Sequence, residues 1–279
     1  MAKKPRASKK KARRKKPATG KQENPGDNVS VRRAMGPSPA TPMPILYSDP
    51  RPLSVDSHGS KSLRRVQGFG FVAKAPAVPL NAAEFMQAAA HYPIVFTQSD
   101  PPIALAVLGI EASVNLFVSV DNRWEQGAYI PAYVRRFPFV FMTVANENKY
   151  VLCIEEETDA LVEGNENPFF EGDRKTKLVD EAIKFCAAYQ KQSDTTKTLT
   201  RALQAQDLLT NNQTEIRLPS GQRIALSGYQ TVDSDRLRDL PNDIYLDWRK
   251  NGWLEPIYLH LVSAANWVRL AQRHEAKLA

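Results

Sequence analysis

The sequence predicts an α+β fold: a single globular domain with a mainly antiparallel sheet and packed helices, preceded by a disordered basic tail. Five short apolar segments have the length and composition of strands: residues 94–96, 103–108, 116–120, 139–144 and 150–154. Most of their links are shorter than the roughly a dozen residues that a parallel crossover needs, which favours antiparallel pairing. Residues 176–210 and 255–274 repeat apolar side chains at helical spacing. We therefore expect one domain over residues 44–273 and a tail over residues 1–43.

The tail is distinguished by its charge. Ten of the 38 Lys and Arg residues lie between Lys3 and Lys16, so the remainder of the chain carries 28 basic against 30 acidic side chains. Residues 1–43 lack apolar periodicity, which predicts disorder. We expect residues 1–16 to contact anionic polymers without sequence preference. Met43 opens the first apolar segment and is an alternative start of the chain.

Export and membrane insertion are not expected. No run of about 18 apolar residues is present, so the sequence predicts no membrane span. Residues 17–30 are polar where the apolar region of a signal peptide would follow the basic residues. Cys153 and Cys186 occur in apolar patterns and are expected to be buried thiols in a reducing compartment. These features predict a cytoplasmic protein, with surface association only by a non-classical route.

The elements before residue 131 begin with residues 69–80, which are predicted to form a strand or extended chain. Asn81 is a candidate N-cap, and Glu84 stands three residues later in the capping-box position. The apolar face that follows predicts a short helix over residues 81–91, which Pro93 ends.

The elements after residue 155 begin with an acidic loop over residues 155–175, which Phe169 or Phe170 is expected to pin to the core. Its carboxylates do not follow the spacing of a calcium loop. After the helix at residues 176–210, alternating apolar residues predict a hairpin over residues 215–226. Two short helices, at residues 234–240 and 241–250, precede the last helix.

The most distinctive stretch is residues 127–141, which mixes apolar, aromatic and cationic side chains. Pro131 suits the first turn of a helix and Pro138 ends one, so a short helix is predicted between them. Tyr129, Tyr133 and Arg136 fall on one side of it. A guanidinium among rings stacks on them or grips a carboxylate with its planar fork, so these three are candidate ligand-binding residues. The alternative is that Arg136 ties a structural helix to an acidic side chain.

Histidines provide further candidates. Trp253, His260, Trp267 and His274 recur every seven residues, which would place His260 and Trp267 along one side of the last helix. They are candidate ligand-binding residues, or else an amphipathic flank packed beneath a neighbouring element. His91 closes the first predicted helix; it is a candidate for the same site, or favours the C-terminal dipole of that helix.

Signatures of catalysis are missing from the sequence. It contains no G-x-S-x-G elbow, no phosphate loop, no His-Glu-x-x-His and no cysteine pair at metal spacing. We therefore assign no catalytic residue, no metal and no cofactor. Gly68-Phe-Gly-Phe resembles half of a dinucleotide-binding pattern, but an extended segment follows it where a phosphate-binding helix is required.

Several short motifs, taken in their order along the sequence, resemble those of one protein family. They are Gly68-Phe-Gly-Phe-Val, His91-Tyr-Pro-Ile-Val-Phe, Asn115-Leu-Phe-Val, Gly127-Ala-Tyr-Ile-Pro-Ala-Tyr-Val-Arg-Arg-Phe-Pro-Phe, Tyr258-Leu-His-Leu-Val-Ser and Asn266-Trp-Val-Arg-Leu. The chain resembles the SapC family of bacterial proteins over about residues 44–272. The resemblance implies a link to bacterial surface layers and the cell envelope, and it carries over no catalytic residue.

Two functions remain open from the sequence. The first is a noncatalytic binding or assembly factor serving the envelope, whose partner is an envelope or surface protein or a small acidic ligand. The alternative is an enzyme acting on a carboxylate-bearing small molecule through Arg136, Tyr133, His91 or His260. Convergence of these side chains in one concave pocket would favour the enzyme.

Overall fold

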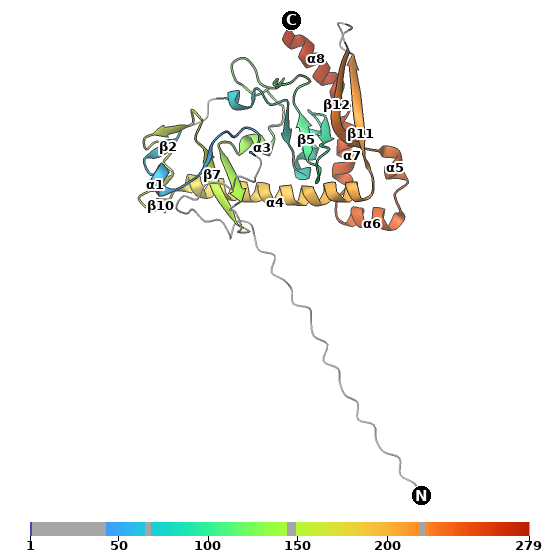
Figure 1. Ribbon diagram of the computed structural model, residues 1–279, viewed down its shortest axis with the longest axis horizontal. Coiled ribbons are helices and arrows are strands. Elements are labelled where there is room, and N and C mark those ends of the chain that lie inside the picture. The colour runs from blue at the N-terminus through green and yellow to red at the C-terminus, as the bar shows by residue number, and fades with distance from the viewer. Residues whose placement is uncertain (2–42, 65–67, 144–148, 218–220, 222, 279) are drawn as a thin grey trace.

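The computed structural model describes residues 1, 43–64, 68–143, 149–217, 221 and 223–278 (Figure 1). The larger sheet has five strands in the order β11-β12-β4-β5-β3. Its strands are β3 (Ala77–Pro79), β4 (Ile94–Phe96), β5 (Ala104–Val107), β11 (Leu209–Arg217) and β12 (Arg223–Val232). Each neighbouring pair in it is antiparallel.

A smaller sheet has three strands in the order β1-β7-β6, also antiparallel. Its strands are β1 (Pro50–Pro52), β6 (Phe139–Thr143) and β7 (Tyr150–Glu155). Two further antiparallel pairs flank it: β2 (Lys61–Leu63) with β8 (Leu161–Glu163), and β9 (Phe170–Glu171) with β10 (Arg174–Lys175).

The helices confirm the predicted α+β class. They are α1 (Val55–His58), α2 (Phe85–Ala88), α3 (Ala132–Arg135), α4 (Lys177–Ala205), α5 (Ser234–Arg238), α6 (Asn242–Lys250), α7 (Leu254–Ser263) and α8 (Asn266–Leu278), with the 3-10 helices η2 (Gly70–Val72) and η3 (Ala82–Glu84).

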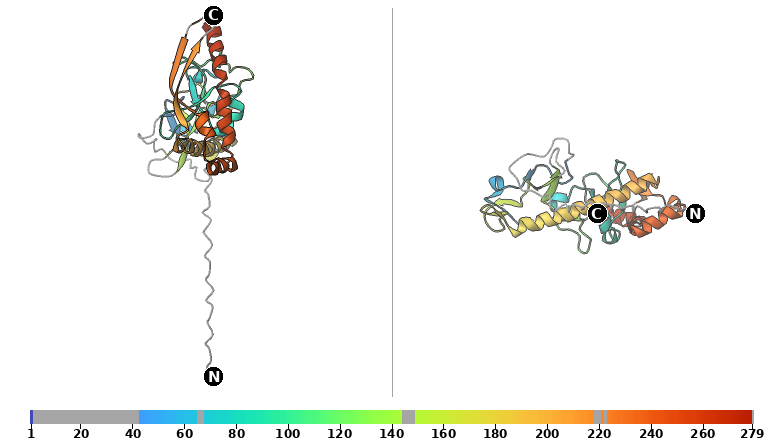
Figure 2. Two further views of the ribbon diagram at one scale, coloured as in Figure 1. Left: turned by 90° about the vertical axis from the view of Figure 1, so that its right-hand side faces the viewer. Right: turned by 90° about the horizontal axis from the view of Figure 1, so that it is seen from below.

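The long helix α4 joins the two sheets. Its 29 residues rise by about 44 Å at 1.5 Å per residue, and it runs along the length of the molecule, past both sheets (Figures 1 and 2). Ala182 and Cys186, in its first half, pack into the core of the three-stranded sheet. Leu199 and Leu203, in its second half, belong to the core of the five-stranded sheet. The helix α4 therefore packs against the cores of both sheets.

Most predicted elements are present with shifted ends. The helix at 131–137 is α3, the hairpin is the longer β11–β12, and Phe169 and Phe170 are both buried, as expected for residues that pin the acidic loop. The acidic loop also contains three short strands that were not expected. The predicted disorder of the tail and the link after Thr143 lie outside the described residues.

Two strand predictions are wrong. Residues 70–72 form the 3-10 helix η2 because Gly68 and Gly70 pack against Asn122; a Cβ on Gly68, whose φ is +88°, would lie 2.5 Å from the Asn122 carbonyl oxygen. Residues 116–120 form only an isolated bridge between Val118 and Trp124, since a turn at Asn122 reverses the chain.

The last helix, predicted as continuous over residues 255–274, is two helices, α7 and α8. Buried polar side chains hold the break. Ser263 Oγ accepts a hydrogen bond from Ile94 N at 2.9 Å, and Asn266 Nδ2 donates to the carbonyl oxygens of Ala89 (2.7 Å) and Tyr92 (3.1 Å). His260 and Trp267 therefore lie on different helices.

Candidate functional site

The segment around α3 is positioned by one buried carboxylate. Glu84 Oε2 accepts from Asn81 N at 3.0 Å, which is half of the predicted capping box, present here on η3. Its Oε1 accepts from Ala132 N at 2.6 Å and from the Tyr129 hydroxyl at 2.9 Å. Glu84 thereby accepts a hydrogen bond from an N–H of the first turn of α3. A helix of only four residues is not stable by itself, so this bond helps to hold α3 in place.

Arg136, the residue after α3, lies among three tyrosine rings. Its guanidinium carbon is 4.1 Å from the ring centre of Tyr133, 4.5 Å from that of Tyr189 and 5.5 Å from that of Tyr47. Tyr47 precedes β1, Tyr133 is on α3 and Tyr189 is on α4, so three separate segments surround the cation. We call Tyr47, Tyr133 and Tyr189 the tyrosine cage. Ring faces at these distances attract a cation.

Two hydroxyl groups of the cage, those of Tyr133 and Tyr47, donate to the backbone. Tyr133 Oη donates to Ile45 O at 2.6 Å, and Tyr47 Oη donates to Phe139 O at 2.7 Å. These bonds fix the rings and bind the 43–47 segment to α3 and β6. Hydrogen bonds to the backbone thus hold Tyr47 and Tyr133 of the cage in place.

Arg136 has no carboxylate partner among the described residues. The ion pairs found there do not include it, and its Nε is buried without a hydrogen-bond partner. A cation in such surroundings is costly unless an anion compensates it. The internal acidic partner that the structural alternative requires is therefore not seen in the described part of the chain.

The surrounding groups are neutral at ordinary pH. Burial raises the pKa of all three cage tyrosines, and Arg136 only partly opposes this. Burial lowers the pKa of Arg136, but the neighbouring phenols and the Cys186 thiol outweigh it and the pKa is raised. Burial also raises the pKa of Cys186 to about 12. Among the described residues, the positive charge of Arg136 in the cage is therefore uncompensated.

A hollow of about 440 Å³ adjoins the cage, within the range of roughly 300–1,000 Å³ usual for small-molecule sites. It lies where β3 and β6, edge strands of the two sheets, approach each other above α4. We call it the Arg136 hollow; Arg136, Tyr133, Tyr189, Pro79, Leu80, Ile103, Val140, Phe141, Thr196 and Lys197 are among the residues that line it.

Tyr129, another candidate, lines a neighbouring hollow of about 410 Å³ that does not include Arg136. Its hydroxyl donates to Glu84 and accepts from Arg135 Nη2 at 3.2 Å. Burial, with the adjacent Glu84 carboxylate, raises the pKa of Tyr129 to about 12. Its polar group is fully engaged, as in a structural contact.

His260 is a cross-link inside the core. Its Nε2 accepts from Val232 N at 3.0 Å, and its Nδ1 donates to Ile94 O at 2.8 Å, so the ring joins α7 to β12 and β4. Burial lowers its pKa to about 4, which keeps it neutral.

Trp267 and His91 lie apart from both Arg136 and His260. Trp267 packs on Tyr229 with ring centres 5.7 Å apart. His91 is partly buried beside Tyr92, and burial, followed by Arg273 and Arg269, lowers its pKa. The structure thus brings Arg136 and Tyr133 together and leaves the other four candidates elsewhere.

Two members of the cage, Tyr47 and Tyr189, were not among the sequence candidates. Tyr189 follows the apolar stripe of its helix and Tyr47 lies in an extended segment, so neither carries a local signal of binding. Positions 47, 133 and 189 meet only through the tertiary fold.

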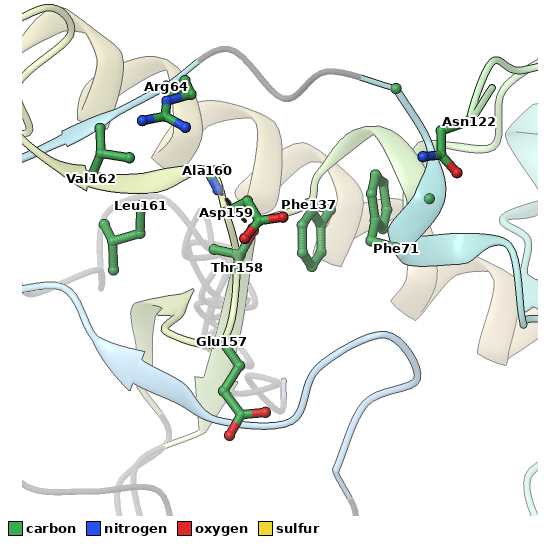
Figure 3. Close-up of a pocket in the computed structure, with 12 residues that line it drawn as sticks. Arg64, Phe71, Asn122, Phe137, Glu157, Thr158, Asp159, Ala160, Leu161 and Val162 are labelled. Carbon is green, nitrogen blue, oxygen red and sulfur yellow. Dashed lines mark hydrogen bonds between the residues drawn. The ribbon is translucent and has the colours of Figure 1, made fainter.

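A larger hollow of about 800 Å³ is lined in part by Phe71 and Phe137 (Figure 3). The rings of Phe71 and Phe137 stack there with centres 4.1 Å apart. Its charged groups, Arg64, Glu157 and Asp159, are exposed, so water satisfies them. This hollow has no charge that needs a ligand.

The described residues contain neither a cluster of metal ligands nor a helix that could span a membrane. No group of three or more His, Cys, Asp or Glu side chains there is placed to hold a metal ion. None of the helices in that part of the chain has the length and apolar character needed to cross a membrane.

The fold and site define an α+β protein with an arginine in an aromatic cage between two sheets, and no described residue compensates its charge. The family model described as SapC matches residues 53–270, which is most of the chain. The chain therefore belongs to the SapC family. No curated protein and no solved structure matches it.

Proposed function

We propose that this SapC-family chain is a noncatalytic binding protein that holds the carboxylate of an acidic ligand against Arg136. The observation that carries the proposal is a charged guanidinium, lining a hollow, with no carboxylate partner among the described residues. A ligand carboxylate would supply the missing counter-charge, and the planar fork of arginine suits it in a bidentate manner.

A binding role is favoured over an enzyme by the groups near Arg136. The cage phenols have raised pKa values and the Cys186 thiol a pKa of about 12, so neither type of group is a ready base or nucleophile at neutral pH. The enzyme hypothesis expects Arg136, Tyr133, His91 and His260 to converge. Only the first two of these line the Arg136 hollow.

We further propose that the binding serves assembly of the bacterial cell envelope or surface layer, since the SapC resemblance implies that setting. In this proposal the chain acts in the cytoplasm, and its residues 1–16 add nonspecific attraction to anionic polymers.

The test is the affinity of the full chain and its Arg136→Lys variant for a panel of carboxylates from butyrate to decanoate. Lysine keeps the charge but loses the fork, so we expect about tenfold weaker binding of every carboxylate, equivalent to about 1.4 kcal/mol. Arg135→Lys is the matched control, because Arg135 is an exposed neighbour outside the Arg136 hollow. Equal affinity of wild type and Arg136→Lys would overturn the proposal.

A further inference from the structure

The Arg136 hollow has more apolar wall than a small polar acid requires. Its aliphatic and aromatic lining comes from both sheets: Pro79, Leu80 and Ala104 from the five-stranded side, and Val140 and Phe141 from the three-stranded side. Apolar surface of this kind gains free energy when a hydrocarbon covers it.

Two polar side chains of the lining, Thr196 and Lys197, already have partners. Thr196 Oγ1 accepts from Ala82 N at 2.9 Å and donates to Gln192 O at 2.7 Å. Lys197 Nζ lies 3.5 Å from Asp194 Oδ1 in an exposed ion pair. Of the two cations in the described lining, Arg136 is therefore the one that has no carboxylate partner.

Exposed apolar side chains mark the mouth of the hollow. Met43, Ile45 and Ile103 line it and are 51%, 48% and 44% exposed. Exposed apolar side chains beside a hollow give a hydrocarbon chain surface to cover. The lining of the hollow thus combines a cation with exposed apolar side chains.

We infer that the ligand is a single-chain amphiphile whose carboxylate pairs with Arg136 and whose hydrocarbon chain extends past Ile103 to the mouth of the hollow. This inference rests on the proposed function of Arg136 and adds the chemical class of the ligand. A volume of about 440 Å³ gives room for one such chain.

The experiment is a calorimetric titration of the full chain with butyrate, hexanoate, octanoate and decanoate, each below its micelle-forming concentration. We expect binding to tighten by up to about fourfold for each methylene, the value for complete burial of a CH₂ group. Decanol, which has the chain without the carboxylate, is expected to bind at least tenfold more weakly than decanoate.

Ile103→Glu places an anion at the mouth of the hollow and is expected to abolish the dependence of affinity on chain length. Val120→Glu is the matched control, since Val120 is 92% exposed and does not line the hollow. Met43→Glu repeats the test at a second position if Ile103→Glu does not fold.

The outcomes separate the two proposals. Arg136-dependent binding with equal affinity for butyrate and decanoate would overturn the amphiphile and leave the proposed function standing. Failure of wild type to bind any carboxylate would overturn both. A variant lacking residues 2–42 that alone shows the chain-length dependence would identify that segment as the occupant of the hollow and also overturn the amphiphile.

Discussion

Arg136 and His260 are both polar side chains that lie against aromatic rings, but they differ in their hydrogen-bond partners. Each nitrogen of His260 meets a backbone group of the larger sheet, at 3.0 and 2.8 Å, and its ring lies 4.9 Å from that of Phe96. Arg136 has three rings around it, and its buried Nε has no hydrogen-bond partner among the described residues. Each ring nitrogen of His260 thus has a partner within the protein, whereas Arg136 Nε has none in that part of the chain.

This difference shows which observation indicates function. Burial and aromatic neighbours are common to both residues and therefore do not distinguish them. Satisfaction of polar groups does, because a folded protein seldom leaves a buried donor unpaired without a reason. His260 therefore fits a scaffold role, and the unpaired Nε of Arg136 supports the recognition role that we propose for it.

The largest effect is expected from His260→Ala. The substitution leaves Val232 N and Ile94 O without partners and opens a cavity, so the free energy of unfolding should fall by about 4 kcal/mol. Urea unfolding measures it. A fall below about 1 kcal/mol would remove the structural side of the comparison.

The next largest effect is the pH dependence that His260 gives to the free energy of unfolding. Its folded pKa of about 4 lies below the unfolded value of 6.5, so the unfolded state takes up the proton first as pH falls. Stability from this group is complete above pH 6.5 and is lost progressively down to pH 4, by about 3 kcal/mol in total. His58, whose pKa burial also lowers, adds in the same direction.

The measurement for this prediction is the NMR titration of the His260 ring, with urea unfolding at each pH. A ring that titrates near 6.5 would contradict the buried, neutral cross-link.

A smaller effect is expected from Glu84→Gln, which removes the charge that holds η3 and α3 in place. Charge-assisted hydrogen bonds to Asn81 N and Ala132 N become neutral ones, so we expect a loss of about 2 kcal/mol by urea unfolding. Because α3 carries Tyr133 and leads into Arg136, carboxylate binding should weaken as well.

Glu166→Gln, at an exposed position of the acidic loop, is the control for Glu84. Equal stability of the two variants would show that Glu84 does not position the site.

The smallest effect on stability is expected from Arg136→Lys without ligand. Lysine keeps the cation among the rings, and no ion pair to a described residue is lost, so the change should stay below about 1 kcal/mol. A loss of about 3 kcal/mol, typical of a buried pair that loses one partner, would make Arg136 scaffold.

The sequence predicted the fold class and the local frame of the site because both depend on neighbouring residues. Pro131 and Pro138 bound α3, and Glu84 forms its half of the capping box, as their spacing indicates. The antiparallel pairing followed from short links between strands.

The rest depends on contacts distant in sequence. The break between α7 and α8 is held by Ser263 and Asn266 through backbone groups at residues 89–94, more than 160 positions away. Tyr189 reaches Arg136 because α4 packs against the cores of both sheets, and Tyr47 reaches it because its hydroxyl bonds to Phe139 O of β6. Neither feature leaves a periodic signal, and so the cage and the helix break were not predictable.

The central claim, that Arg136 is a recognition group, is tested most directly by the guanidinium NMR resonances of the full chain during titration with decanoate. Arg136→Lys identifies the Arg136 signal by its absence. We predict a saturable shift of the Arg136 resonance and little change at Arg135, which donates to Ile130 O from its exposed position. An Arg136 resonance that stays unchanged at saturating decanoate would contradict the account.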